Sequence, residues 1–164
     1  MKQSAGLLVF RRQNNLVEVL LVHPGGPFWA KKDQWMIPKG ELEDNEDHKT
    51  AALREFEEEL GIKPPDGEFI DLGQAKQGNK INFVWAIEGN PDLSNFKSNT
   101  FSMEWPPKSG RQQEFTEIDR AEWFDLTSAK SKLFKTQTEF IDRLAVNLDL
   151  SLEESPKFEQ QSLI

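Results

Sequence analysis

Short apolar runs separated by polar turns fill the first part of the chain and predict strands. Residues 7–10 and 17–22 predict the two strands of a hairpin, with residues 11–15 as its turn. Residues 23–34 are rich in Pro and Gly and predict a loop, after which residues 35–37 predict a short strand.

The period then changes to that of a helix, which is expected to run from Asn45 to Leu60. Asn45 suits the helix cap, and Gly61 suits its end. At 100° per residue, Leu53 and Phe56 fall on the same arc as Leu60, so this arc is the expected core face.

The rest of the chain mixes strands and helices without a regular βαβ rhythm. This mixture predicts an α/β fold, with a mixed sheet covered by helices, in a single domain over residues 1–148. The expected elements are a strand pair at 68–74 and 81–87, a short strand at 101–105 before a loop at 106–113, a final strand at 121–126, helices at 127–133 and 136–148, and a weakly ordered tail over 149–164.

Composition excludes several classes of protein. No run approaches the roughly 18 apolar residues of a membrane span, so no membrane association is expected. The absence of cysteine excludes disulfides and thiolate zinc sites, and a cytoplasmic location is the default expectation. The net charge of −8 argues against binding to a nucleic acid polymer. A monomer and a homodimer are both compatible with the sequence.

The negative charge is concentrated in one segment, since residues 41–59 hold nine carboxylates against Lys49 and Arg54. Glu55, Glu58 and Glu59 have the spacing i, i+3, i+4, which places three carboxylates side by side, away from the core arc. Mg²⁺ or Mn²⁺ would relieve their repulsion, because hard divalent cations prefer oxygen ligands. A solvated acidic helix explains the same pattern without any ligand.

The surrounding residues separate these two interpretations. Nine positions over 23 residues match a known pattern without a departure: Gly40, Glu46, Arg54, Glu55, Phe56, Glu58, Glu59, Gly61 and Ile62. The segment resembles the signature of the Nudix hydrolases. That resemblance implies an α/β/α sandwich around a mixed sheet, and hydrolysis of a nucleoside diphosphate linked to another group, X.

The resemblance also implies roles for the matched residues. Glu55, Glu58 and Glu59 are expected to ligate the metal, assisted by the carbonyl of Gly40. Glu46 and Arg54 are expected to hold the loop to the helix, with Arg54 orienting Glu55. Arg54, Glu55 and Glu58 therefore count among the expected catalytic residues, and Gly61 completes the structural motif.

The proton acceptor remains open between three places. Glu117 lies at the entrance to the last expected strand and resembles the auxiliary acid of MutT-type and diadenosine-tetraphosphate-cleaving members. Glu114 competes with it, and so do the carboxylates of the motif helix.

The substrate is indicated only in outline. Residues 35–40, Trp-Met-Ile-Pro-Lys-Gly, resemble the entry to the motif in diadenosine-polyphosphate hydrolases, which implies that Lys39 contacts a phosphate. Those hydrolases often stack adenine on a tyrosine, and this chain has none. Trp29 is the expected substitute, and Phe28, Phe101 and Trp105 are alternatives.

The expected substrate is an NTP or a dinucleoside polyphosphate, with Mg²⁺ as cofactor and Mn²⁺ as a possible substitute. Alternatives are ADP-ribose, a nucleotide sugar or a diphosphoinositol phosphate. ADP-ribose is less favoured because Gln77 and Gly78 stand near the place where ADP-ribose hydrolases tend to carry a proline. Two non-enzymatic alternatives are a nucleotide-binding module and an acidic interaction protein; the intact carboxylates argue against the first, and the full motif match argues against the second.

Overall fold

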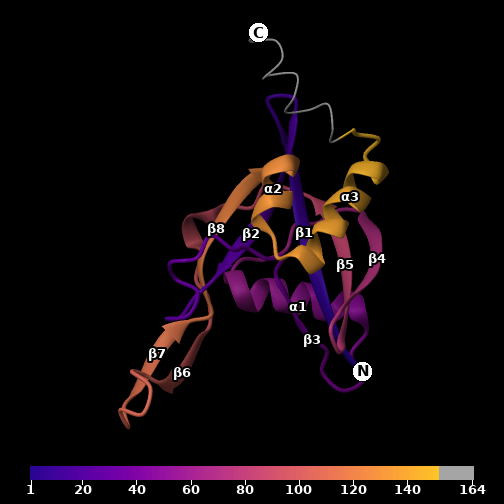
Figure 1. The fold of residues 1–164 in the computed structure, drawn as a ribbon. Coiled ribbons are helices and arrows are strands. Elements are labelled where there is room, and N and C mark those ends of the chain that lie inside the picture. Colours follow the sequence, from indigo (N-terminus) through magenta and orange to yellow (C-terminus); the bar gives the residue numbers. More distant parts are fainter. Residues whose placement is uncertain (152–164) are drawn as a thin grey trace.

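A computed structural model describes residues 1–151 as an α/β/α sandwich around a mixed sheet (Figure 1). The predicted fold class is confirmed. The strands of the central sheet are β1 (Lys2–Gln13), β2 (Leu16–Pro24), β3 (Lys39–Glu41), β4 (Phe69–Gln77), β5 (Lys80–Glu88) and β8 (Ile118–Asp125). The helices are α1 (His48–Leu60), α2 (Leu126–Lys132) and α3 (Thr138–Asn147), with 3₁₀ turns η1 (Leu93–Asn95) and η2 (Lys135–Gln137).

The strand order is β4-β5-β1-β2-β8, and β3 pairs with the first half of β1 on the side away from β5. The central strands β1 and β5 run parallel, whereas every other pair in this sheet is antiparallel. The long strand β1 therefore has β3 beside it near its start and β2 beside it near its end.

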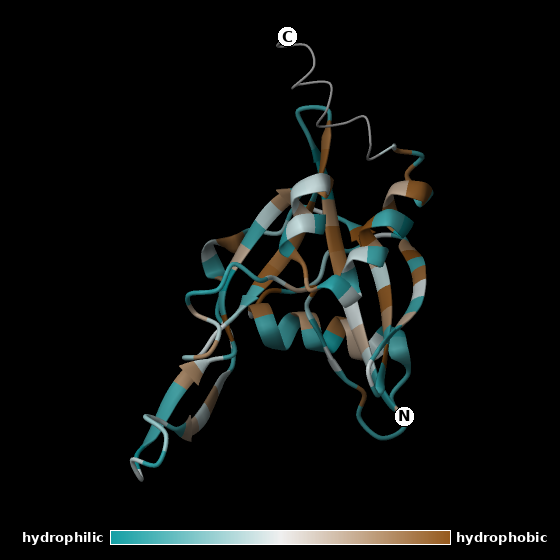
Figure 2. Cartoon of the chain, viewed as in Figure 1, coloured by the Kyte–Doolittle hydropathy of each residue, from teal (hydrophilic) through white to brown (hydrophobic). Residues whose placement is uncertain are grey.

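Both faces of the sheet are buried, which explains the continuous apolar runs in β1 and β2. On one face, Leu7 and Val9 of β1 pack with Phe56 of α1. On the other face, Leu8 of β1 packs with Phe140 of α3. Figure 2 shows the hydrophobic residues concentrated in these central strands, with hydrophilic residues along much of α1.

A second sheet consists of the hairpin β6 (Thr100–Glu104) and β7 (Gln112–Thr116), which projects from the body of the molecule (Figure 1). The sequence predicted β6 but assigned part of β7 to a loop. The residues of β7 are mostly polar and exposed, so its alternation carries a weak signal.

The start of the motif helix differs from the prediction. Asn45 has a left-handed backbone with φ of 62°, and the helix begins three residues later at His48. Asp47 is the cap instead, because its side chain accepts hydrogen bonds from the backbone amide and the hydroxyl of Thr50. The expected strand at residues 35–37 consists only of isolated bridges at Trp35 and Met36.

The expected tail begins at residue 149, and residues 152–164 lie outside the described part of the chain. The boundary at residue 148 stays a prediction. None of the helices within residues 1–151 has the length and apolar character needed to cross a bilayer.

Candidate active site

Gly40 brings the loop before α1 into direct contact with the helix. In the β1–β3 register Gly40 lies opposite Ala5, on the sheet face that packs against α1. A Cβ atom at position 40 would lie 2.0 Å from Oε2 of Glu55, far inside van der Waals contact. Only glycine leaves room for the Glu55 carboxylate at this place, which explains why the first residue of the motif is glycine.

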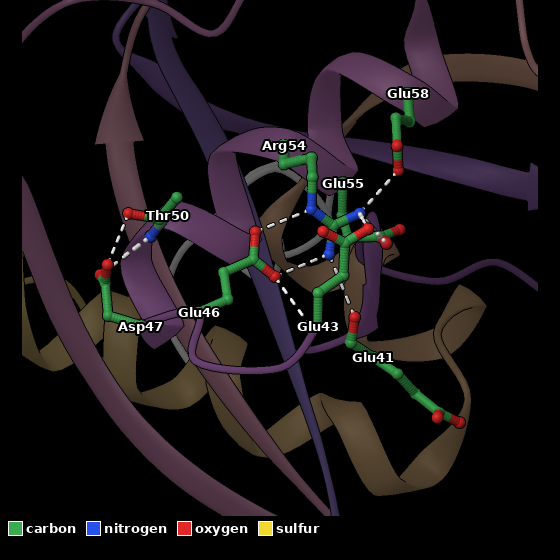
Figure 3. Close-up of polar contacts among 8 residues, drawn as sticks. All are labelled: Glu41, Glu43, Glu46, Asp47, Thr50, Arg54, Glu55 and Glu58. Atoms are coloured by element: carbon green, nitrogen blue, oxygen red, sulfur yellow. Dashed lines mark hydrogen bonds and ion pairs between the residues drawn. The ribbon is translucent and has the colours of Figure 1, made fainter.

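Arg54 joins the loop to the helix through its guanidinium group (Figure 3). Its Nε and Nη2 donate to the two oxygens of Glu46 at 2.8 and 2.9 Å, in the bidentate geometry that suits arginine and a carboxylate. Its Nη1 donates to Glu55 and to Glu58, both at 2.8 Å. The expected roles of Glu46 and Arg54, and the contact that orients Glu55, are consistent with this geometry.

Gly61 ends the helix in a left-handed conformation, with φ of 67°. Its amide donates to the carbonyl of Glu57, and a Cβ atom there would lie 2.5 Å from the carbonyl of Lys97. Both the backbone conformation and the close approach therefore favour glycine.

The carboxylates facing the sheet are crowded and partly desolvated. Burial raises the pKa of Glu59 well above its usual value, and the charges of Glu55 and Glu117 raise it further, while Lys39 opposes them. Burial also raises the pKa of Glu55, against the lowering effect of Arg54 and with a contribution from Glu58 and Glu117. Oε1 of Glu59 is buried and has no hydrogen-bond partner.

These observations fit a hard cation. An orphaned carboxylate oxygen, neighbouring carboxylates with raised pKa values and a backbone segment without a side chain at Gly40 form the oxygen-rich donor set that Mg²⁺ and Mn²⁺ prefer. Within residues 1–151, however, no three acidic or histidine side chains are already gathered closely enough to hold an ion. Glu58 in particular is hydrogen-bonded to Arg54 and partly exposed. The ligand set of Glu55, Glu58, Glu59 and Gly40 therefore stays a prediction.

Of the two candidate bases outside the helix, Glu117 is the one near the motif. Its charge contributes to the raised pKa values of both Glu55 and Glu59. Glu114 instead lies on the projecting hairpin, where it accepts a hydrogen bond from the hydroxyl of Thr100.

Lys39 lies on β3 directly before Gly40 and is half-buried. Its pKa is lowered, first by burial and then by the charge of Lys80, while Glu59, Glu41 and Glu55 act in the opposite direction. An ammonium group within reach of the motif carboxylates is the geometry that the phosphate-contact prediction requires.

Trp29 has less freedom to stack a base than the sequence suggested. Its ring makes an edge contact with Phe134, with centroids 5.3 Å apart, and the Lys32 ammonium lies 4.8 Å from its centroid. Phe28 is 57% exposed and makes an edge contact with Trp105 of the hairpin. The exposed aromatic surface of the loop is thus Phe28, one of the predicted alternatives.

One polar contact near Glu117 gave no sequence signal. His23 is fully buried, and its Nδ1 lies 2.7 Å from Oδ1 of Asp119. Its partner lies 96 residues further along the chain, so only the pairing of β2 with β8 brings them together.

The family follows from comparison with known proteins. The model of the NUDIX domain matches residues 1–144, which include the whole motif and every strand described above. The chain therefore belongs to the Nudix family.

Curated relatives differ in what they act on. The chain is 27% identical over 129 residues to the mRNA-decapping enzyme subunit 2 of Saccharomyces cerevisiae, covering 77% of this chain and 11% of that protein. It is 27% identical over 120 residues to human diphosphoinositol polyphosphate phosphohydrolase 2, covering 73% and 60%. The chain thus spans only part of the length of these relatives.

Among solved structures, the Caenorhabditis elegans Ap4A hydrolase in a binary complex aligns with a TM-score of 0.58 at 18% identity. The alignment covers 91% of this chain and 98% of that one. At this identity the match establishes the fold.

Proposed function

We propose that this chain is a Mg²⁺-dependent hydrolase that cleaves a phosphoanhydride bond in a nucleoside diphosphate linked to X, with NTPs and dinucleoside polyphosphates as its substrates. The observation that carries the proposal is the contact of Gly40 with Glu55, beside the buried and unpartnered Glu59 oxygen. This arrangement concentrates carboxylate oxygens where a phosphate-bound cation would bring the missing positive charge.

The residues divide the work as follows. Glu55, Glu58, Glu59 and the Gly40 carbonyl would hold Mg²⁺, which supplies charge neutralisation of the diphosphate and a more acidic water when bound. Arg54 keeps Glu55 in place and ties the helix to the loop through Glu46. Lys39 binds a phosphate oxygen, and Glu117 accepts the proton of the attacking water.

Because Glu55, Glu58 and Glu59 are all present, the motif supports an enzyme rather than a nucleotide-binding module without catalytic activity. A relative that is a diphosphoinositol polyphosphate phosphohydrolase keeps that substrate as a second candidate, and it shares with dinucleoside polyphosphates a phosphate-rich X.

The test is a hydrolysis screen of the full chain over NTPs, dinucleoside polyphosphates, ADP-ribose, nucleotide sugars and diphosphoinositol phosphates, with and without Mg²⁺, Mn²⁺ and chelator. Glu58→Gln should reduce kcat on the best substrate by on the order of 100-fold, because it removes a ligand from the metal centre. Glu57→Gln is the matched control, since Glu57 lies on the same helix, is exposed and stands at no motif position.

Unchanged melting temperatures in both variants would assign the loss to chemistry. Wild-type kcat in Glu58→Gln would refute the metal assignment, and turnover in the presence of excess chelator would refute the metal dependence.

A further inference from the structure

Three lysines converge on the sheet face opposite α1, where β1 and β5 begin side by side and β3 ends next to the start of β1. Nζ of Lys2 and Nζ of Lys80 each lie 3.9 Å from the same oxygen, Oε2 of Glu41. Lys2 and Lys80 are direct partners in the parallel β1–β5 pair, so their side chains leave neighbouring strands on the same face.

Lys39 joins them from β3. It lies opposite Gly6 in the β1–β3 pair, and a Cβ atom on Gly6 would lie 2.9 Å from Cβ of Lys39. The side chain of Lys39 therefore starts on the face of Gly6, away from α1. Since Glu41 lies opposite Ser4 in the same strand pair, Lys39 and Glu41 leave β3 on the same face as Lys2 and Lys80.

The cluster stands out against the charge of the molecule. On this face the ammonium groups of Lys2 and Lys80 both lie near the carboxylate of Glu41, and Lys39 adds a third positive charge, whereas the whole chain carries a net charge of −8. Such a local excess of positive charge costs free energy through mutual repulsion, and an anion would relieve it.

Beneath the lysines lie two polar side chains that each have one oxygen without a hydrogen-bond partner. Ser4 and Asn82 are direct partners in β1 and β5, and both are fully buried. Neither Ser4 Oγ nor Asn82 Oδ1 has a hydrogen-bond partner, although Asn82 Nδ2 donates to Gln77. Buried polar atoms without partners are rare in native proteins, so this pair indicates a missing partner.

We propose that Lys2, Lys39 and Lys80, with Ser4 and Asn82 beneath them, form an anion subsite that binds a phosphate carried by group X. The inference rests on the proposed function and narrows it: preferred substrates carry phosphate beyond the bond that is cleaved. Lysine binds phosphate as a point charge, and a neutral sugar offers it nothing comparable.

The position of Lys39 connects this subsite to the catalytic one. Consecutive residues of a strand point to opposite faces, so Lys39 and Glu41 face the lysine cluster while Gly40 between them faces Glu55. A chain of phosphates that passes the edge of β3 would therefore contact both the lysine cluster and the carboxylates around Gly40.

The first experiment compares Lys80→Gln with wild type on three substrates: a dinucleoside tetraphosphate, a diphosphoinositol polyphosphate and ADP-ribose. Lys80 is chosen because its side chain is partly exposed at the start of β5 and its loss leaves no cavity in the core. The value of kcat/KM should fall about tenfold on a phosphate-rich substrate, mainly through KM, and less than twofold on ADP-ribose. Lys80→Arg should restore most of the loss.

Lys76→Gln is the matched control. Lys76 lies on the neighbouring strand β4 opposite Ile81, on the other face of the sheet, and is exposed. It should change none of the three values. Whether the dinucleoside or the inositol substrate shows the larger effect tells which source of phosphate the subsite accepts.

Equal losses on all three substrates, or no loss, would overturn the subsite. A binding measurement separates this failure from failure of the proposed function: tripolyphosphate titrated calorimetrically without divalent metal should bind wild type about tenfold more tightly than Lys80→Gln. If the chain hydrolyses nothing but shows this difference, the subsite stands without the enzyme; if the affinities are equal, the subsite is wrong.

Ser4→Ala tests whether the buried side chains beneath the lysines take part in binding. The variant should also bind tripolyphosphate more weakly than wild type, because it removes the Ser4 hydroxyl. A change in melting temperature with unchanged binding would show that Ser4 and Asn82 serve only a buried water.

Discussion

Nδ1 of His23 lies 2.7 Å from Oδ1 of Asp119, and its Nε2 contacts the carbonyl of Lys32. Asp119 Oδ1 and the carbonyl of Lys32 can both accept a hydrogen bond, so each ring nitrogen faces an acceptor. The first contact fixes the strand that starts directly after Glu117, and the second fixes the loop that carries Trp29. The amide of Gly25 adds a hydrogen bond of 2.8 Å to the carbonyl of Glu117.

Substitutions at His23 should separate these two contacts. Glutamine can reach the Nε2 position and keep the bond to Lys32, whereas asparagine can reach the Nδ1 position and keep the bond to Asp119. His23→Gln should lower kcat about tenfold, because Asp119 and with it Glu117 lose their anchor, while His23→Asn should mainly raise KM. Steady-state kinetics of both variants check this, and identical kinetic profiles would contradict it.

Glu117→Gln should reduce kcat by roughly 10²–10⁴-fold with little change in metal affinity, if Glu117 accepts the proton in the reaction. Metal affinity is measured by titration calorimetry with Mn²⁺. Glu114→Gln is the control, because Glu114 lies on the hairpin, where its side chain accepts a hydrogen bond from Thr100. A normal kcat in Glu117→Gln would return the role to the motif helix.

Gly40→Ala should lower both activity and metal affinity, because the added methyl group would collide with the Glu55 carboxylate. The loss should resemble the roughly 10²-fold effect of misplacing a catalytic group. Gly78→Asn is the control, since Gly78 has a φ of 58° that asparagine tolerates and no heavy atom near its Cβ position. A fully active Gly40→Ala would show that the loop can move aside.

The raised pKa of Glu59 predicts how stability depends on pH in metal-free protein. A carboxyl whose pKa is higher in the folded state binds more protons when folded, so stability falls as the pH rises from the ordinary value of 4.5 through the raised one. Glu59→Gln should flatten this fall, and Mg²⁺ should reduce it in wild type. Melting temperatures of both proteins, measured from below pH 4.5 upward into the neutral range, give the difference. Parallel curves would contradict the prediction.

The motif could be predicted from the sequence because most of its contacts are local. Arg54, Glu55 and Glu58 lie within one turn of the same helix, and Gly61 ends that helix four residues after Glu57, so spacing alone places them. The contact between Arg54 and Glu46 spans only eight residues. The core arc with Phe56 and Leu60 follows from the same helical period.

The rest depends on strand pairing, which spacing does not encode. Ser4 meets Asn82 and Lys2 meets Lys80 only through the parallel β1–β5 pair, and His23 meets Asp119 only through β2 and β8. The helix start was misplaced because Asn45 and Asp47 are both good caps, and the binding of Glu46 by Arg54 holds the preceding loop out of the helix. The residues of a strand do not indicate which distant strand will pair with it.

Among the described strands, the three-residue strand β3 pairs only with β1, with Gly40 opposite Ala5. A slip of one residue in this pairing would turn Lys39 and Glu41 toward the acidic helix and Gly40 toward the lysines. Deleting or inserting one residue between Trp35 and Lys39 would therefore reverse which residues of β3 face α1 and which face the lysines. The motif and the lysines would still be present, but neither site would be assembled.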